Sequence, residues 1–96
     1  MKVLVTGTAG YVGAALVTDL QSDHEIVQAD IVPYDPERIP WVYEALEVER
    51  KPEHLPRPDS HLPFHAGSIL DMEYCRRITE GVDAAIHLSG NVKHDE

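Results

Sequence analysis

Three evenly spaced glycines follow a short apolar run at the start of the chain. Residues 3–5 are Val-Leu-Val, and a β-branched run too short for a helix predicts a buried strand. The glycines are Gly7, Gly10 and Gly13, and a helical pattern of apolar residues starts at Tyr11. Strand, glycine-rich turn and helix in this order are the context in which such glycines indicate dinucleotide binding. The spacing is G-x-x-G-x-x-G rather than G-x-G-x-x-G.

Each glycine of this turn (residues 7–13, the glycine turn) has a separate predicted role. Gly7 lets the chain turn tightly after the strand, where a Cβ would clash. Gly10 lets backbone amides approach a pyrophosphate closely, and Gly13 lets the helix lie close to the strand. The amides of Gly10, Tyr11 and Val12 are then expected to face the phosphates at the positive end of the helix dipole. The alternative is that the glycines have only a structural role in a strand-to-helix turn.

A second strand is predicted over residues 25–30, after a helix over residues 11–21. A strand, a helix and a strand this close in sequence predict a βαβ unit with parallel strands. Asp30 ends the second strand at the distance from the glycines expected for the residue that binds the adenosine ribose. A carboxylate there repels a 2′-phosphate, which favours NAD over NADP. The alternative is a surface aspartate that opens a turn, and Asp35 is a weaker substitute for the ribose role.

The stretch 31–61 is rich in proline and is predicted to be an insertion. All seven prolines of the chain lie between Pro33 and Pro63, which excludes long regular elements there. A short helix is predicted over residues 40–50, with Trp41 as a core or interface anchor rather than a ligand contact. Residues 51–63 are expected to form an irregular surface segment. The link is long compared with the usual connection of about two to six residues.

The rest of the chain predicts a strand over residues 62–66, a helix and a fourth strand over residues 82–88. Asp71 is a good N-cap for the helix, and Gly81 occupies the C′ position that ends it. The apolar run of the fourth strand is typical of a strand covered on both faces. Ser89 and Gly90 follow, at the strand end where open α/β sheets bind ligands.

Composition restricts the partners and the compartment. The chain has 17 Asp and Glu against 8 Lys and Arg, and without a basic stripe it is not expected to bind nucleic acid. Such an acidic, lysine-poor surface suits a high-salt cytoplasm and an ordinary acidic protein equally. No apolar run is long enough to span a membrane and the N-terminus does not resemble a secretory signal, so a cytoplasmic protein is expected. The single cysteine, Cys75, excludes an internal disulfide, and the six histidines form no metal-binding pair.

Four segments, in their order and spacing, resemble the extended short-chain dehydrogenases/reductases of the NAD-dependent epimerase/dehydratase kind. They are Val5–Gly13, Asp30, Gly67–Asp71 and Gly81–Gly90. The chain matches the N-terminal portion of that family only. The resemblance implies that residues 1–96 form a partial doubly wound α/β domain, the first half of a Rossmann fold. Its parallel strands are expected in the order 3-2-1-4.

The resemblance also implies which residues contact the NAD cofactor. The pyrophosphate would lie on residues 6–13, the ribose on Asp30, the adenine beside Ser68 and Ile69, and the nicotinamide near residues 88–90. The expected cofactor-binding residues are Gly7, Gly10, Tyr11, Val12, Gly13, Asp30, Ser68, Ile69, Leu88, Ser89 and Gly90. The family usually has an aspartate where Ser68 stands, so one hydrogen bond to the adenine is expected to be weaker or remade by the hydroxyl. Ser89 and Gly90 replace a common Ala-Ala pair, a change expected to do little harm.

The proton-transfer pair of the family is missing from this chain. Family members place a catalytic tyrosine four residues before a lysine, which lowers the pKa of that tyrosine. No tyrosine here has a lysine at that position; the four are Tyr11, Tyr34, Tyr43 and Tyr74. We therefore expect the NAD-binding portion of an oxidoreductase that acts on a nucleotide sugar in a complete relative and is inactive alone. A non-catalytic dinucleotide-sensing module and a truncated fragment stay as alternatives, and the oligomeric state is left open.

Overall fold

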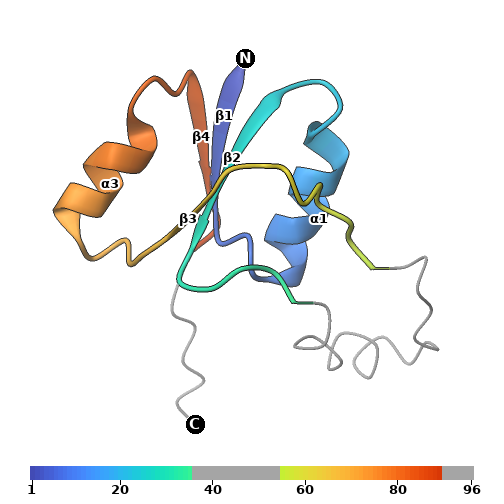
Figure 1. Ribbon diagram of the computed structural model, residues 1–96, viewed down its shortest axis with the longest axis horizontal. Helices are drawn as coiled ribbons and strands as arrows, with labels where there is room; N and C mark the ends of the chain where they lie inside the picture. Colours follow the sequence, from blue (N-terminus) through green and yellow to red (C-terminus); the bar gives the residue numbers. More distant parts are fainter. Residues whose placement is uncertain (36–54, 90–96) are drawn as a thin grey trace, which may run out of the picture.

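The computed structural model describes residues 1–35 and 55–89, which form a parallel sheet between two helices (Figure 1). The strands are β1 (Lys2–Thr6), β2 (Glu25–Asp30), β3 (Phe64–Ala66) and β4 (Ala84–His87), in the order β3-β2-β1-β4. Helices α1 (Tyr11–Leu20) and α3 (Met72–Thr79) lie on opposite sides of the sheet. The predicted partial doubly wound fold with order 3-2-1-4 is confirmed. The predicted helix over residues 40–50, with Trp41, falls outside the described residues.

Strand register brings all four carboxyl ends to one edge of the sheet. Thr6, the last residue of β1, pairs with Ala29 of β2 on one side and with His87 of β4 on the other. Asp30, the last residue of β2, pairs with Ala66 of β3. The segments that leave the four strands therefore start side by side, although they are far apart in the sequence.

Alternate residues of β1 pack on opposite faces of the sheet. Val3 and Val5 form a buried cluster with Ile26 of β2 and Val17 of α1. Leu4 packs on the other face, in the cluster beneath α3. Because both faces are covered, β1 consists of apolar residues in succession, which is the pattern that predicted a buried strand.

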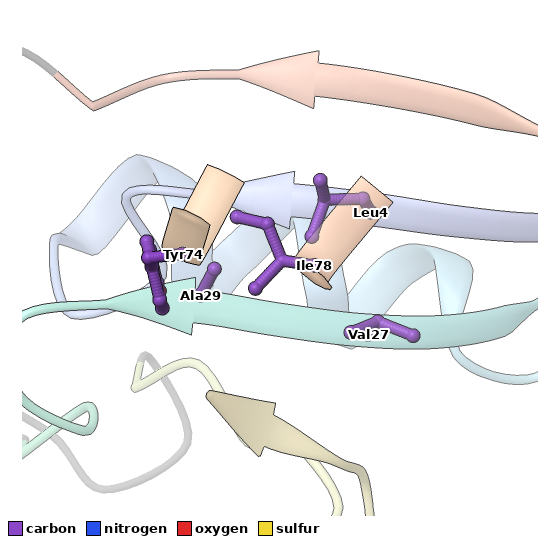
Figure 2. Packing of buried hydrophobic residues seen from close by; sticks show 5 residues of the cluster. All are labelled: Leu4, Val27, Ala29, Tyr74 and Ile78. Carbon is purple, nitrogen blue, oxygen red and sulfur yellow. The ribbon is translucent and has the colours of Figure 1, made fainter. Parts of the chain in front are cut away.

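A second cluster fills the space between α3 and the sheet (Figure 2). Its buried members are Leu4, Val27, Ala29, Tyr74 and Ile78. The Tyr74 side chain is 2% exposed, and its hydroxyl donates a hydrogen bond of 2.5 Å to the backbone oxygen of His65. Gly67 makes room for this ring, since a Cβ at that position would lie 2.4 Å from two ring carbons.

The two ends of α3 have the chemistry that the sequence predicts. The Asp71 carboxylate accepts hydrogen bonds from the backbone amides of Glu73, at 3.0 Å, and Tyr74, at 3.3 Å. Gly81 follows the C-cap residue Glu80 with φ of +72°, a conformation that favours glycine. No helix among the described residues is long and apolar enough to cross a membrane.

The segment 55–63 is irregular, as predicted, but it is tied to α1. The Gln21 side chain donates to the backbone oxygen of Arg57, at 3.1 Å, and accepts from the amide of Asp59, at 2.7 Å. The Thr18 hydroxyl accepts from the amide of Arg57, at 2.8 Å. Leu62 packs against the apolar cluster on the α1 side. Gln21 thus attaches the end of the insertion to the domain.

Two strands differ from their predicted extent. β3 begins at Phe64 rather than at residue 62, and Pro63 precedes it with its carbonyl accepting from the amide of Gln28 at 2.9 Å. β4 covers Ala84–His87 rather than residues 82–88, and its residues alternate between half-buried and exposed. The prediction that this strand is covered on both faces is wrong for the described part of the chain. The reason is that α3 packs over β1 and β2 and leaves β4 at the edge.

Tyr74→Phe should lower the free energy of unfolding at neutral pH. It should also make that free energy fall less steeply as the pH becomes alkaline. At pH 7 the loss should be about 1 kcal/mol, because the backbone oxygen of His65 loses its donor. Burial, and after it the Asp30 carboxylate, raises the pKa of Tyr74 above its ordinary value of 10.0. The stability that the protonated Tyr74 hydroxyl contributes is complete below pH 10, and it is lost as the pH rises through the higher pKa of the folded state. Urea unfolding at pH 7 to 11 tests this, and parallel declines in both proteins would contradict it.

Candidate dinucleotide site

A cavity of about 710 Å³ opens at the carboxyl edge of the sheet. All four strands contribute to this sheet-edge cavity through the residues that end or follow them. Its lining comprises Gly7, Gly10, Ala29, Asp30, Ile31, Gly67, Ser68, Ile69, Leu70, Tyr74, Leu88 and Ser89. This is the edge at which open α/β sheets bind ligands.

Gly7 meets two requirements at the exit of β1. Its φ is +81°, in the region that side chains rarely allow. A Cβ at Gly7 would also lie 2.8 Å from the backbone carbon of Leu88 and 2.8 Å from the amide nitrogen of Ser89. The predicted tight turn is present, and the same residue lets the segment after β4 pass close to the turn.

Gly13 is required by backbone contact within the glycine turn. A Cβ there would lie 2.1 Å from the carbonyl oxygen of Gly7 and 3.0 Å from the Cα of Thr8. The sequence predicted that Gly13 packs against the strand, whereas the structure places it against the turn that follows the strand. Any side chain at this position would push α1 away from the sheet.

Gly10 differs from the other two glycines because the protein itself does not need it. Among residues 1–35 and 55–89, a Cβ there would have only the Gly7 carbonyl oxygen within contact range, at an ordinary 3.6 Å. The backbone angles of Gly10, φ of −81° and ψ of 165°, are open to any residue. Because Gly10 lines the sheet-edge cavity, its bare backbone keeps that part of the cavity clear.

The first turn of α1 directs backbone amides toward the same edge. Gly10 is the N-cap, no side chain of the described residues caps the helix, and its first turn has no acidic residue. The amides of Tyr11, Val12 and Gly13 belong to the first turn, where a helix has no internal acceptors. The amide of Gly10 differs from expectation, since it donates to the Gly7 carbonyl at 3.3 Å. The first-turn amides and the dipole of α1 suit a negatively charged group.

Asp30 holds the glycine turn in place. One carboxylate oxygen accepts from the amide of Ala9 at 2.8 Å, and the other accepts from the amide of Ile31 at 2.6 Å. The bond to Ile31 matches the turn-opening alternative, and the bond to Ala9 is a contact that the sequence did not predict. Each carboxylate oxygen keeps further acceptor capacity, so Asp30 can also accept hydrogen bonds from hydroxyl groups in the cavity.

Thr6 performs the corresponding task on the β4 side. Its hydroxyl oxygen, in a residue 6% exposed, accepts from the amides of Leu88, at 3.1 Å, and Ser89, at 3.4 Å. The hydroxyl lies 2.7 Å from Nδ1 of His87. Because the oxygen accepts from two amides, its hydrogen is left to donate to Nδ1. Thr6 thereby fixes the segment after β4 against the end of β1.

The structure brings most, but not all, of the predicted site residues together. Those that line the sheet-edge cavity are Gly7, Gly10, Asp30, Ser68, Ile69, Leu88 and Ser89. Tyr11, Val12 and Gly13 lie in the first turn of α1 and do not line the cavity, and Gly90 falls outside the described residues. Sequence reasoning missed Ile31, which is 71% exposed at the cavity, and its apolar character directly after Asp30 was the available signal.

Metal ligands do not gather in the described parts of the chain. Across residues 1–35 and 55–89, no three His, Cys, Asp or Glu side chains are arranged to hold a metal ion. His54 and His94 fall outside these ranges.

Comparison with known proteins identifies the family and supports the fold. The chain matches the NAD dependent epimerase/dehydratase family over residues 3–96. A UDP-glucose-4-epimerase from Stenotrophomonas maltophila with bound NAD and formylated UDP-arabinopyranose has 23% identity and a TM-score of 0.64, over 97% of this chain and 25% of that one. A UDP-glucose 4-epimerase from Bifidobacterium longum in complex with NAD+ and UDP has 21% identity and a TM-score of 0.62, over 95% and 25%. No curated protein sequence matches. The chain thus spans about a quarter of the length of these structures.

Asp30→Ala should destabilise the fold by about 2 kcal/mol, because the amides of Ala9 and Ile31 lose a charged acceptor. Asp30→Asn should lose about 1 kcal/mol, since its amide group can replace only one of the two accepting oxygens. The matched control is Asp83→Asn at the opposite end of the sheet. Asp83 accepts one hydrogen bond, from the amide of Lys2 at 2.8 Å, and asparagine can keep it. Urea unfolding measures all three, and equal effects of Asp30→Asn and Asp83→Asn would show that Asp30 does not anchor the turn.

Proposed function

The chain belongs to the NAD-dependent epimerase/dehydratase family, and from that membership we propose that it is the NAD-binding portion of an oxidoreductase acting on a nucleotide sugar. The observation that carries the proposal is Gly10. A Cβ at this glycine would crowd none of the residues that the structure describes, and the glycine lies in a cavity at the carboxyl edge of a parallel sheet beside a helix N-terminus. A bare backbone at that place has a physical reason if a pyrophosphate approaches it closely.

The cofactor would lie across the edge of the sheet, from β3 to β4. We place the pyrophosphate at the glycine turn and the adenosine ribose at the free lone pairs of Asp30. The adenine would lie beside Ser68 and Ile69, and the nicotinamide near residues 88–90. The exposed apolar side chains of Ile69 and Leu88, 40% and 41% exposed, suit the two ring systems at the two ends.

We assign these residues to the binding of the cofactor rather than to turnover. Bound NAD would supply hydride transfer, and the residues of this chain would hold and orient it. Because the sequence has no Tyr-x-x-x-Lys pair, we propose that the 96 residues alone do not convert a substrate. The nucleotide-sugar assignment is supported by the UDP-containing ligands of the two structures described above. The cytoplasmic location expected from the sequence stays a prediction.

Gly10→Ala should separate binding from folding. The variant should melt within a few degrees of the wild type, because the nearest described atom beyond the chain neighbours is 3.6 Å from its methyl group. Its affinity for NAD should fall by about tenfold or more, because the methyl group occupies the space that the pyrophosphate needs. Gly13→Ala is the contrasting variant, and it should lose cooperative folding. Calorimetric titration with NAD and thermal melting test both variants. Unchanged NAD affinity in a folded Gly10→Ala protein would refute the placement of the pyrophosphate.

The chain should bind NAD at least about tenfold more tightly than NADP at low salt. The carboxylate of Asp30 is held by two backbone amides, so it cannot easily turn away from an added 2′-phosphate. Two negative groups at such close range repel each other by more than the free energy that a tenfold difference requires. Parallel titrations with the two dinucleotides measure the ratio. Raising the salt concentration should lower the ratio of NAD affinity to NADP affinity, because salt screens the repulsion. A preference for NADP would exclude the ribose role of Asp30.

A further inference from the structure

A second cavity, of about 290 Å³, lies between β3 and α3. We call it the α3 cavity, and its lining comprises Phe64, His65, Ala66, Tyr74, Arg77 and Ile78. We propose that the α3 cavity binds a small carboxylate that carries an apolar ring or chain, and that Arg77 holds the carboxylate group. This site is separate from the candidate dinucleotide site, and the proposal does not depend on the function proposed above.

The place of the α3 cavity follows from how α3 packs on the sheet. The buried residues of α3 join a cluster with Leu4 of β1 and with Val27 and Ala29 of β2. β3 lies beyond β2, at the edge of the sheet. His65 of β3 pairs with Ala29, and paired residues of neighbouring strands have their side chains on the same face. The side chain of His65 therefore lies on the face that α3 covers over β1 and β2.

The helix contributes an apolar surface and one charge to the α3 cavity. Tyr74 and Ile78 lie between α3 and the sheet, where they are 2% and 5% exposed (Figure 2). Arg77 comes three residues after Tyr74, a spacing that places two side chains on neighbouring parts of a helix surface. Burial and then Asp30 raise the pKa of Tyr74, whereas the positive charge of Arg77 lowers it. The guanidinium charge therefore acts on a group that lines the cavity.

The charge of Arg77 is available to a ligand, unlike that of the neighbouring arginine. Arg76 forms an ion pair with Glu73, at 3.3 Å. In the described parts of the chain, no carboxylate lies within ion-pair distance of Arg77, and no acidic residue lines the α3 cavity. The planar guanidinium group can donate two parallel hydrogen bonds to a carboxylate. The charge and its geometry therefore favour a ligand with a carboxylate group.

The size and the apolar surface of the α3 cavity indicate the rest of the ligand. A cavity of about 150 Å³ is enough for benzene, so about 290 Å³ can hold one ring with a short acidic group. The Tyr74 ring and the Ile78 side chain offer apolar contact, since the Tyr74 hydroxyl already donates its hydrogen to the backbone oxygen of His65. An inorganic anion would leave this apolar surface unused. A carboxylate with an apolar body uses both parts of the lining.

Benzoate is the probe for the test, in an NMR titration of the isotope-labelled chain. The backbone amides of residues 64–66 and 74–78 should shift and saturate with a dissociation constant of about 1 mM. Benzyl alcohol, which lacks the charge, and phosphate, which lacks the ring, should each bind at least about tenfold more weakly. A result in which either of them binds as tightly as benzoate would contradict the proposed ligand class.

Arg77→Gln should weaken the binding of benzoate by about tenfold, because the carboxylate loses its charged partner. Arg76→Gln is the matched control. It changes the net charge by the same amount on the same helix, and its affinity for benzoate should stay within about twofold of the wild type. Both arginines are exposed, so both variants should melt within a few degrees of the wild type.

Three results would overturn the proposal. Equal weakening by the two variants would show a general attraction of anions to positive charge. Shifts confined to residues 29–31 and 67–70, with displacement of benzoate by NAD, would place the probe in the sheet-edge cavity. Shifts that grow with concentration and do not saturate would show that the α3 cavity does not bind benzoate. Saturable binding that persists in the presence of NAD supports the proposal, and so does the same binding in a chain that fails to bind NAD.

Discussion

The arrangement of the whole domain depends on one backbone contact, between the start of α1 and the carbonyl oxygen of Gly7. This contact exists only because Gly13 has no side chain, since a Cβ would lie 2.1 Å from that oxygen. It sets where α1 begins relative to β1, and so how Val17 reaches the cluster that contains Val3 and Val5. It also directs the first-turn amides of α1 to the edge where the four strands end. Packing and the orientation of the site therefore have the same cause.

The sheet-edge cavity is kept open by side chains that form hydrogen bonds with other segments of the same chain. Asp30 accepts from the amide of Ala9 and so joins the glycine turn to the end of β2. Thr6 accepts from the amides of Leu88 and Ser89 and so joins the exit of β4 to the end of β1. A ligand entering this space meets polar groups that are already positioned, which reduces the ordering that binding requires. The same contacts make the site sensitive to any change in strand register.

Features with local causes could be predicted from the sequence, and features with distant causes could not. The span of β2, the cap at Asp71 and the C′ role of Gly81 follow from neighbouring residues. The strand order 3-2-1-4 was expected from the family resemblance, since parallel pairing alone leaves more than one order open. The attachment of Gln21 to Arg57 and the fit of Gly67 to the Tyr74 ring join residues that no local pattern relates. The covering of β4 was predicted wrongly for a similar reason, since burial depends on which strands α3 packs over.

The three glycines have different origins, and this difference decides what their motif can show. Gly7 and Gly13 are explained by the fold alone, through a positive φ and through contacts that a Cβ would make impossibly short. A domain with no ligand would need both of them. Gly10 has permitted backbone angles and, within the described parts of the chain, open space before it, so the packing seen there gives no reason for a glycine. The functional meaning of the motif therefore lies in Gly10, whereas Gly7 and Gly13 indicate only that a strand and a helix pack closely together.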